Sequence, residues 1–397
     1  MNVVIVGGGI AGVSTATGLR DCGFDGGLTI VDAGEFPHDR PPLTKSFLAG
    51  RSDHGQIALQ PPEWYSRHSV ELLTRASVTA LRPHEGRVEL ADGRSLPADR
   101  VVLATGGRAA RPPIPGIDAV QVHTVRTVDD ADRLRAVLVS GARVLVVGAG
   151  LIGAEVASTA AGLGCEVVVV DPIGVPLAHA VGPELAEWLH DRHRVHGVTT
   201  IHARVVSLRA FPATTAAVLT GEEHARVFDV VVIGVGMVPE TTLAEAAGLT
   251  VDGGVLVNAG QITSNPAVLA VGDPARNGAG RAEHWEAAQL DGIRAAATLL
   301  DRAGPAPAAP WYWSDRYGNH LEVVGRMADA MHTVVRGVLD HPPFAVFGLR
   351  GDRVIAAATV DDSNAARAAR RLIDRAVPVD QRKLADPSVH LRSLLRS

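Results

Sequence analysis

Three glycines, Gly7, Gly9 and Gly12, follow a short apolar run near residue 1. A turn of this spacing joins a buried strand to a helix and presents backbone N–H groups to the pyrophosphate of a dinucleotide, at the positive end of the helix. Asp32 comes about 20 residues later, where a carboxylate can accept hydrogen bonds from a ribose diol. Such turns also join elements that bind nothing, but the acid and the flanking pattern favour a dinucleotide site.

Residues 144–171 repeat this pattern, with the glycines Gly148, Gly150 and Gly153 and the acid Asp171. This internal duplication predicts a second dinucleotide site. No arginine follows Asp171, and a carboxylate at that position repels a 2′-phosphate but can bond a free 2′-hydroxyl. We therefore expect the second site to prefer NADH to NADPH.

Two cations, Arg40 and Lys45, lie in a proline-rich loop after Asp32, and a short helix is expected to begin near Leu43. Both cations can be ordinary solvated side chains. A loop stiffened by prolines can instead fold over the far end of a bound dinucleotide, where Lys45 would face its reactive ring.

Glu155 stands two residues beyond Gly153, within the first turns of the second predicted helix. One interpretation is a carboxylate that compensates the helix dipole. The other places Glu155 near the reacting rings of two stacked cofactors, where it could pair with Lys45. Such a pair would set the local field, although desolvation offsets its attraction.

Continuous apolar runs predict buried strands at residues 3–6, 101–103 and 144–147, and two more lie within residues 229–239 and 269–274, each followed by glycine. Residues 70–106 alternate as strands do, with a hairpin turn at residues 91–93. The strand at 101–103 ends in Ala104, Thr105 and Gly106, where the backbone can approach a ligand closely. Residues 111–116 are predicted to be a linker.

Asp273 and Trp285 each have two interpretations. Asp273 precedes Pro274, which is typical of a helix N-cap followed by proline at the first helical position. Its carboxylate can alternatively bind the ribityl chain of a flavin. Trp285 lies near the start of a predicted helix, where it either fills the core or packs beside the cofactor rings.

A Pro/Ala linker at residues 302–310 separates a third region, with predicted strands at 321–324, 332–335, 344–348 and 354–360. The tail from residue 365 carries eight cations against three acids. The cations are Arg367, Arg370, Arg371, Arg375, Arg382, Lys383, Arg392 and Arg396. They form either a solvated helix face or part of a dock for an acidic partner.

The composition sets limits on function. With 397 residues, 46% hydrophobic and 20% charged, the chain can form two or three globular domains, and its net charge of -5 gives no global attraction to nucleic acid or membranes. Cys22 and Cys165 lie far apart, without the spacing of a zinc site or a redox dithiol, and no other ligand pattern indicates a metal. No signal peptide or membrane span is visible, so we expect a cytoplasmic protein.

Several segments in order resemble one family over essentially the whole chain: VGGGIAG, PHDRPPLTKSFLAG, LATGGRAARPPIPG, VVGAGLIGAEVA, VIGVGMVPET, AVGDPARNG, RAEHWEAAQLDG and YWSDRYG. The chain resembles the FAD-dependent NADH:ferredoxin reductases of bacterial oxygenase systems, of the putidaredoxin reductase and Rieske dioxygenase type. Thr44 stands where that family usually has serine. The absent cysteine pair separates the chain from disulfide reductases of the same fold.

The resemblance implies an α/β protein with two Rossmann-like domains of the glutathione-reductase type and a smaller α+β domain. FAD would bind to residues 1–110 and 229–305, NADH to residues 111–228, and residues 311–397 would form the α+β domain. The implied FAD ligands are Ala11, Asp32, Arg40, Lys45, the backbone of Val78, Arg126, Asp273 and Trp285, with Glu155 and Asp171 on the NADH side. Ile152 and Gly236 complete the set of candidate cofactor-binding residues, and Lys45, Glu155 and Trp285 are the candidate catalytic residues.

The implied activity is electron transfer from NADH through FAD to an acidic [2Fe-2S] ferredoxin that serves a cytochrome P450 or a Rieske oxygenase. The protein would be a monomer or a weak homodimer. Two alternatives stay open. One is an NADH oxidase or rubredoxin-type reductase, and the other is an NADH-responsive flavoprotein resembling apoptosis-inducing factor.

Overall fold

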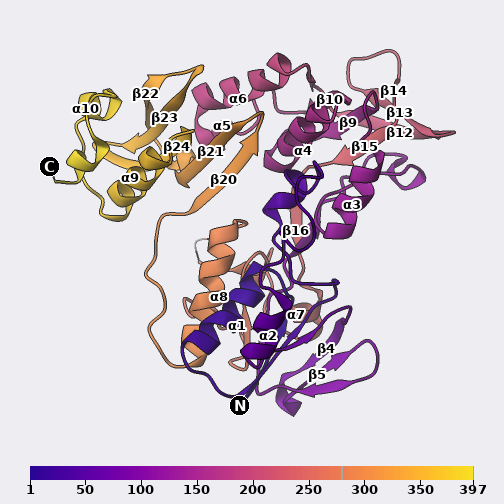
Figure 1. Cartoon of the computed structure of the whole chain (residues 1–397), viewed down its shortest axis with the longest axis vertical. Helices are drawn as coiled ribbons and strands as arrows, with labels where there is room; N and C mark the ends of the chain where they lie inside the picture. The colour runs from indigo at the N-terminus through magenta and orange to yellow at the C-terminus, as the bar shows by residue number, and fades with distance from the viewer. Residues whose placement is uncertain (279, 397) are drawn as a thin grey trace. The chain divides into compact units, whose positions relative to one another are not determined.

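The structure, a computed structural model, describes residues 1–278 and 280–396 and divides into two compact units (Figure 1). The first unit consists of Met1–Pro42, Ser52–Arg108 and Met237–Ala306, and the second of Leu43–Arg51, Ala109–Gly236 and Pro307–Ser397. Each unit therefore gathers segments that are distant in the sequence. The side chain of Arg396, one of the tail cations, lies outside the described part.

A five-stranded parallel sheet of order β18-β7-β1-β2-β3 forms the centre of the first unit. Its strands are β1 (Asn2–Val6), β2 (Gly27–Val31), β3 (Glu71–Leu73), β7 (Arg100–Leu103) and β18 (Val268–Ala270). In register, Val4 of the central strand lies opposite Thr29 on one side and Val101 on the other. The carboxyl ends of β1, β2 and β7 consequently meet at one edge of the sheet, the edge that carries Gly7, Asp32 and Ala104.

Both faces of this sheet are covered, as the continuous apolar runs predict. Val3 and Ile5 belong to the core cluster that contains Ala16 and Ala295, whereas Val4 and Val6 belong to a second cluster on the opposite face. Successive side chains of a strand point to opposite faces, so only a strand buried on both sides needs an unbroken apolar run.

Helices α1 (Ile10–Asp21) and α8 (Trp285–Leu299) lie side by side against the first face (Figure 1). Their axes approach closely because small residues line the contact: a Cβ atom on Gly292 would lie 2.3 Å from the carbonyl oxygen of Ala11. The helix predicted around Trp285 is confirmed, and it begins at that residue.

The remaining elements of the first unit pack against the two faces of this sheet. A three-stranded antiparallel sheet contains β4 (Val78–Arg82), β5 (Arg87–Leu90) and β6 (Ser95–Pro97), so the hairpin predicted at residues 91–93 is confirmed. The remaining elements are the 3-10 turn η2 (Pro83–Glu85), α2 (Pro62–Arg67), α7 (Thr242–Ala246), β17 (Val255–Leu256) and β19 (Ala275–Arg276). Strands β8 (Gly107–Ala109) and β16 (Met237–Pro239) lie where the chain passes from one unit to the other.

Two local predictions need correction. The short helix expected near Leu43 is a 3-10 turn, η1 (Pro41–Thr44), which begins at Pro41 because proline suits the first position of a helical turn. The N-cap interpretation of Asp273 is wrong, since strand β19 follows Pro274 and α8 begins only at Trp285, with His284 as its N-cap.

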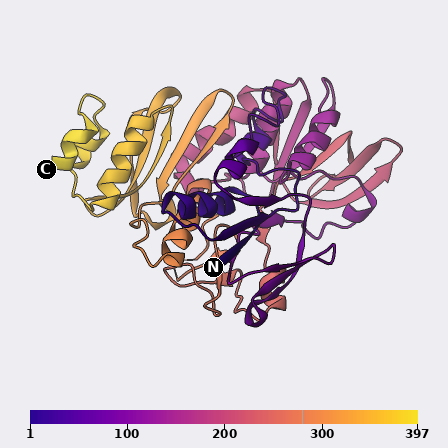
Figure 2. The ribbon, with the colours of Figure 1, turned by 60° about the horizontal axis from the view of Figure 1, so that its bottom comes forward.

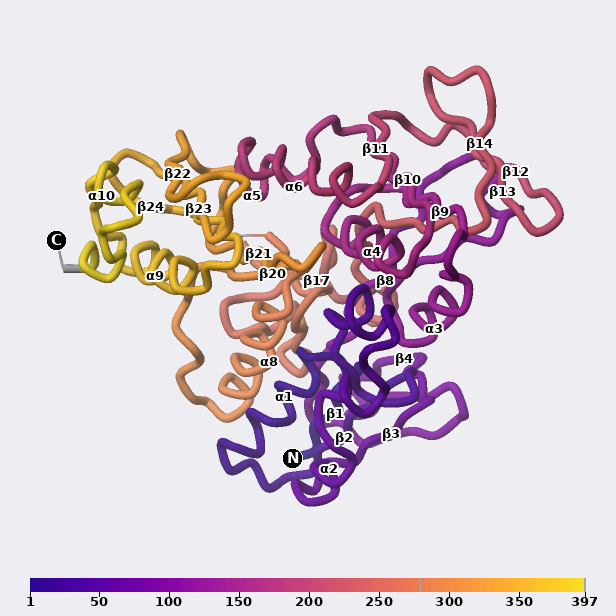
Figure 3. Tube along the Cα trace, turned by 45° about the horizontal axis from the view of Figure 1, so that its top comes forward, coloured from indigo at the N-terminus to yellow at the C-terminus, as the bar shows by residue number. Residues whose placement is uncertain are grey.

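The second unit contains a four-stranded parallel sheet of order β11-β10-β9-β15. Its strands are β9 (Arg143–Val147), β10 (Glu166–Asp171), β11 (Thr199–His202) and β15 (Val230–Ile233). Helix α4 (Leu151–Gly162) follows β9 and packs against β9 and β10 (Figure 3). The inserted segment 43–51 joins this core, because Leu48 is fully buried in the cluster formed by Val144, Val146 and Val156.

An antiparallel meander and several helices complete this part. The meander contains β12 (Val205–Phe211), β13 (Thr214–Leu219) and β14 (Arg226–Phe228). The helices are η3 (Ile117–Ala119), α3 (Val128–Val137), α5 (Ala178–Val181) and α6 (Pro183–Val195). Across residues 1–278 and 280–396, no helix is both long and apolar enough to cross a membrane.

The C-terminal part of the second unit is a five-stranded antiparallel sheet of order β20-β21-β24-β23-β22 (Figure 2). Its strands are β20 (Trp311–Arg316), β21 (Asn319–Gly325), β22 (His332–Val338), β23 (His341–Arg350) and β24 (Arg353–Val360). Helix α9 (Ser363–Asp374) covers one face, and α6 packs on the other through Trp188, whose ring centroid lies 5.1 Å from that of Phe344. The short elements η4 (Met327–Asp329), α10 (Gln381–Ala385) and η5 (Leu391–Arg396) complete it.

Candidate functional site

The first glycine turn has the geometry of a phosphate cradle. Gly7 adopts a φ of +113°, and a Cβ atom there would lie 2.2 Å from the carbonyl oxygen of Ala104. At Gly12 a Cβ atom would lie 2.0 Å from the carbonyl oxygen of Gly7, so only glycine permits this approach of helix to strand. In the described structure the first turn of α1 has neither an acidic residue nor a side-chain cap, which leaves its N–H groups for an anion.

The acids at the ends of β2 and β10 are held in the same way. Asp32 accepts hydrogen bonds from the N–H of Gly8 and, at 2.6 Å, from that of Gly34. Asp171 accepts from Ala149 at 2.7 Å and from Ile173 at 2.8 Å. Each carboxylate therefore lies against its own glycine turn, where a ribose hydroxyl can replace a backbone donor. The two turns fit two dinucleotides.

Arg40 and Trp285 lie near the first turn. A Cβ atom on Gly9 would lie 3.0 Å from Nη1 of Arg40, so the guanidinium group covers the turn. The indole N–H of Trp285 donates to Asp39 at 2.6 Å, which ties the start of α8 to the proline-rich loop. The hydroxyl of Thr105, just beyond the end of β7, donates to the carbonyl oxygen of Glu240 at 2.7 Å.

The first unit thus contains about half of the sequence-predicted site. These residues are Gly7, Gly9, Ala11, Gly12, Asp32, Arg40, Val78, Ala104, Thr105, Gly106, Asp273 and Trp285. Val78 is the first residue of β4, and Asp273 is half-buried in the turn before β19. Their roles toward a cofactor remain predictions.

The second unit contains the others, namely Lys45, Arg126, Gly148, Gly150, Ile152, Gly153, Glu155, Asp171 and Gly236. A small hollow beside this glycine turn is lined by Ala149, Asp171, Ile173 and His202, among others, and lies next to the predicted ribose acid. Ile152 is 45% exposed at the start of α4. Arg126 lies just before α3, where its backbone N–H donates to Asp130 at 3.1 Å.

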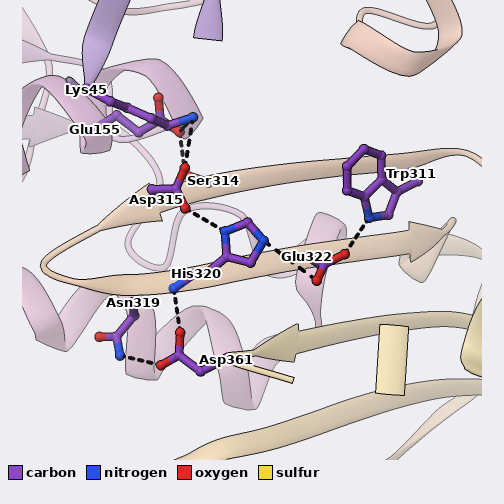
Figure 4. A network of polar contacts seen from close by, with 9 residues as sticks. All are labelled: Lys45, Glu155, Trp311, Ser314, Asp315, Asn319, His320, Glu322 and Asp361. Carbon is purple, nitrogen blue, oxygen red and sulfur yellow. Dashed lines mark hydrogen bonds and ion pairs between the residues drawn. The ribbon is translucent and has the colours of Figure 1, made fainter. Parts of the chain in front are cut away.

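Lys45 and Glu155 form the predicted ion pair, with 3.3 Å between Nζ and Oε1 (Figure 4). The carboxylate of Glu155 is buried, and it also accepts hydrogen bonds from Thr44 at 2.5 Å and Ser314 at 2.7 Å. Three donors from two other segments therefore compensate the desolvation of this charge. A glutamate that only compensated the helix dipole would not require these three donors.

Lys45 has a second partner that the sequence did not indicate. Its Nζ lies 3.4 Å from Oδ2 of Asp315 and 5.6 Å from the ring centroid of Trp313. Ser314 and Asp315 belong to β20, which sequence reasoning missed because WYWSDR shows no regular alternation of apolar and polar residues. The motif YWSDRYG indicated the resemblance, but nothing in it indicated contacts with residues 44, 45 and 155.

Comparison with known proteins agrees with this arrangement. Residues 1–292 match the family described as pyridine nucleotide-disulphide oxidoreductase, and residues 311–395 match the reductase C-terminal family. The chain is 36% identical to putidaredoxin reductase of Pseudomonas putida over 99% of its length and 96% of the relative. It is 40% identical to the ferredoxin–NAD(+) reductase component of an anthranilate 1,2-dioxygenase system from Burkholderia cepacia, with 99% and 98% covered.

Among solved structures, the covalent putidaredoxin reductase–putidaredoxin complex contains a similar chain. The TM-score is 0.94 at 35% identity, and the alignment covers 100% of this chain and 98% of the other. The similarity therefore includes both units and the C-terminal sheet.

Proposed function

The chain belongs to the ferredoxin–NAD(+) reductases of the pyridine nucleotide-disulphide oxidoreductase family, and from this premise we propose how its residues perform electron transfer. FAD and NAD(H) are its cofactors. The proposed reaction passes electrons from NADH through FAD to a [2Fe-2S] ferredoxin of a P450 or Rieske oxygenase system. The observation that carries the proposal is the pair of matching glycine turns, each with an acid bonded to its backbone.

The first turn is assigned to FAD and the second to NADH. Gly7, Gly9 and Gly12 leave space and backbone donors for the pyrophosphate of FAD, and Asp32 and Arg40 bind at the same turn. Gly148, Gly150, Gly153 and Asp171 repeat this arrangement for NADH, with Asp171 favouring a free 2′-hydroxyl. In this proposal residues 1–110 and 229–305 form the FAD domain and residues 111–228 the NADH domain, except that residues 43–51 and 229–236 belong to the same compact unit as the second glycine turn.

When bound, FAD would supply the chemistry that links a two-electron hydride donor to a one-electron acceptor. The protein's own contribution is orientation and field rather than an acid or base. Lys45 is held by carboxylates, and Glu155 is held by hydroxyl donors and by Lys45, so the protein itself supplies the contacts that orient both side chains. Trp285, fixed by Asp39, is proposed to pack beside the flavin.

A dithiol mechanism does not fit this chain, despite the name of its family. Cys22 belongs to α1's C-terminal end and Cys165 directly precedes β10, and both are free thiols. Disulfide reduction through the flavin requires two cysteines near each other. The acceptor is accordingly proposed to be an external one-electron carrier.

The partner is proposed to be an acidic ferredoxin. The relatives of this chain are named as reductases of ferredoxins, and one of them was solved in a covalent complex with putidaredoxin. The cations of the tail, such as Arg367 and Arg370, supply charge of the required sign. A monomer or weak homodimer suffices for this activity.

The test uses the purified protein loaded with FAD. Under anaerobic conditions we expect NADH to bleach the flavin absorbance within seconds, and added [2Fe-2S] ferredoxin to support reduction of cytochrome c. A flavin that stays oxidised at millimolar NADH would disprove the assignment. Fast turnover with dioxygen and none with any ferredoxin would favour the oxidase alternative.

A further inference from the structure

The Lys45–Glu155 pair is the inner end of a longer row of charges on one face of the β20–β21 hairpin (Figure 4). Asp315 binds Lys45 through Oδ2 and the imidazole of His320 through Oδ1, with 2.5 Å between Oδ1 and Nδ1. On its other side, Nε2 of His320 lies 3.6 Å from Oε1 of Glu322. The signs alternate along the row from Glu155 to Glu322.

The register of strands β20 and β21 brings the side chains of this row together. Asp315 lies directly opposite His320 in the antiparallel pair β20–β21, and Glu322 follows His320 by two residues on the same face of the sheet. Ser314 points to the opposite, buried face and reaches Glu155 from there. The hairpin therefore contacts both members of the Lys45–Glu155 pair.

The geometry favours a doubly protonated His320. Ionised carboxylates only accept hydrogen bonds, so Nδ1 of His320 carries a proton toward Asp315, and the carboxylate of Glu322 facing Nε2 favours a proton there as well. Glu322 is only 7% exposed, and its Oε2 accepts from Trp311 at 2.8 Å, while the distance from Oε1 to His320 is that of an ion pair rather than of a hydrogen bond. A buried carboxylate of this kind requires a positive charge nearby.

The pKa shifts of His320 and Asp315 have the directions expected for a charged pair. The hydrogen bond to Asp315, followed by the nearby carboxylate of Glu322, raises the pKa of His320 to about 10. Burial alone would raise the pKa of Asp315, but its bond to His320 and the charge of Lys45 outweigh burial and lower it. The other groups that face the row are Asp361, whose carboxylate accepts from the backbone N–H of His320 at 2.7 Å, and Arg316, whose buried charge acts on Glu155.

We propose that Asp315 and His320 are positioning residues for Lys45. The imidazolium of His320 holds the Asp315 carboxylate in one rotamer, and that carboxylate fixes the ammonium group of Lys45 beside Glu155. The inference rests on the proposed function, in which Lys45 and Glu155 act near the reacting rings. Neither Asp315 nor His320 belongs to a glycine turn or to the predicted cofactor ligands.

The physical reason is the freedom of the lysine side chain. Lys45 has four rotatable bonds and an ammonium group without fixed bonding directions, so a single carboxylate would leave it several rotamers. Two carboxylates on different elements, α4 and β20, leave one position that satisfies both. Asp315 itself is 42% exposed, and without His320 its carboxylate can turn to solvent.

The test compares Asp315→Asn, His320→Gln and the double variant. Each is loaded with FAD and mixed anaerobically with NADH, without ferredoxin, and the rate of flavin bleaching is followed. We expect Asp315→Asn to lower the rate constant at saturating NADH about tenfold, because the reacting groups lose alignment, and to leave NADH affinity within about twofold. His320→Gln should lower the rate constant less.

The double variant distinguishes action through Asp315 from independent action. We expect His320→Gln to have no further effect once Asp315 is Asn, since residues of one chain of contacts are not additive. His320→Lys, which restores a cation, should recover most of the lost rate. Asn319→Ala is the matched control, because it removes the bond from the same hairpin to Asp361 and leaves the row intact.

A second readout needs no turnover. In protein labelled with ¹⁵N-histidine, both ring nitrogens of His320 should be protonated at pH 8, and Asp315→Asn should move the titration of His320 toward its ordinary value near 6.5. A His320 that is neutral at pH 8 in the native protein overturns the inference, as do additive effects in the double variant or wild-type rates in both single variants. A native flavin that NADH fails to bleach would instead contradict the proposed function, and the NMR result would still decide the state of the row.

Discussion

At the scale of single residues, Glu155 is the side chain whose burial needs the most compensation. It is buried, and its charge is compensated by Lys45, Thr44 and Ser314, which come from two other segments of the chain. The sequence predicted the pair with Lys45, because Lys45 lies in the loop expected to fold over the first dinucleotide and Glu155 lies just after the second glycine turn. It could not predict Ser314 or Asp315, since contacts between distant segments depend on how β20 packs against α4.

Replacing this carboxylate tests its role directly. Glu155→Gln should lower the stability by about 3–5 kcal/mol, because Lys45 and the two hydroxyls lose a charged acceptor in a buried place. It should also slow flavin reduction or weaken the discrimination between NADH and NADPH. Thermal unfolding and anaerobic stopped-flow mixing measure the two effects. Unchanged rates with both donors would contradict the place assigned to Glu155.

We expect the preference for NADH over NADPH to depend on Asp171. Its carboxylate accepts from the backbone of Ala149 and Ile173, and its negative charge repels a 2′-phosphate. Asp171→Asn retains one acceptor oxygen but removes the charge, so we expect the ratio of kcat/KM for NADH over NADPH to fall about tenfold or more. Asp32→Asn at the other turn is the comparison: it should reduce FAD content without changing that ratio.

At the scale of elements, the two strand–turn–helix units were the most predictable part of the molecule. Glycine spacing, apolar runs and the terminal acids of residues 3–32 and 144–171 all indicate the same structure, and each is confirmed. The N-cap alternative for Asp273 was wrong because the Asp-Pro pair fits turns as well as helix starts, and its role in binding a cofactor stays a prediction. Strand β20 was missed because its contacts, not its pattern, determine its conformation.

Substitutions of two glycines in the second turn allow an effect on packing to be distinguished from an effect on NADH binding. A Cβ atom on Gly153 would lie 2.0 Å from the carbonyl oxygen of Gly148, whereas one on Gly150 meets no atom within 4 Å. Gly153→Ala should therefore lower the melting temperature by several degrees. Gly150→Ala should leave it unchanged and raise the KM for NADH, because the methyl group occupies space beside the pyrophosphate.

Melting curves and steady-state kinetics of the two variants check this pair of expectations. FAD content serves as the control, since both glycines lie outside the first turn. An equal loss of melting temperature in the two variants would show that the space beside Gly150 is not open.

At the scale of the whole molecule, the row of charges makes stability depend on pH. The pKa of His320 is raised to about 10, above its value in an unfolded chain, so its protonation favours the folded state. That contribution is fully present below about pH 6.5 and is lost as pH rises to 10. Glu322 acts in the opposite direction: its pKa is lowered to about 2, and its contribution is lost as pH falls toward that value.

Denaturant unfolding of the native protein and of His320→Gln tests this dependence. The difference in unfolding free energy between them should be largest at pH 6, smaller at pH 8 and close to zero at pH 10. His332→Gln, at the exposed start of β22 in the same sheet, is the control and should give no such trend. A difference that is constant across this range would contradict a charged His320.

The contacts of β20 with other segments also limit how this protein can be recombined with its relatives. Ser314 and Asp315 belong to the C-terminal sheet, but their partners are Glu155 in α4 and Lys45 in the inserted segment 43–51. A chimera that took residues 307–397 from another reductase would carry a β20–β21 hairpin adapted to the lysine and glutamate of that other reductase. Exchanging the C-terminal part alone should therefore disturb the Lys45–Glu155 pair, and chimeras should function only when residues 43–51 and the start of α4 come from the same reductase as the C-terminal part.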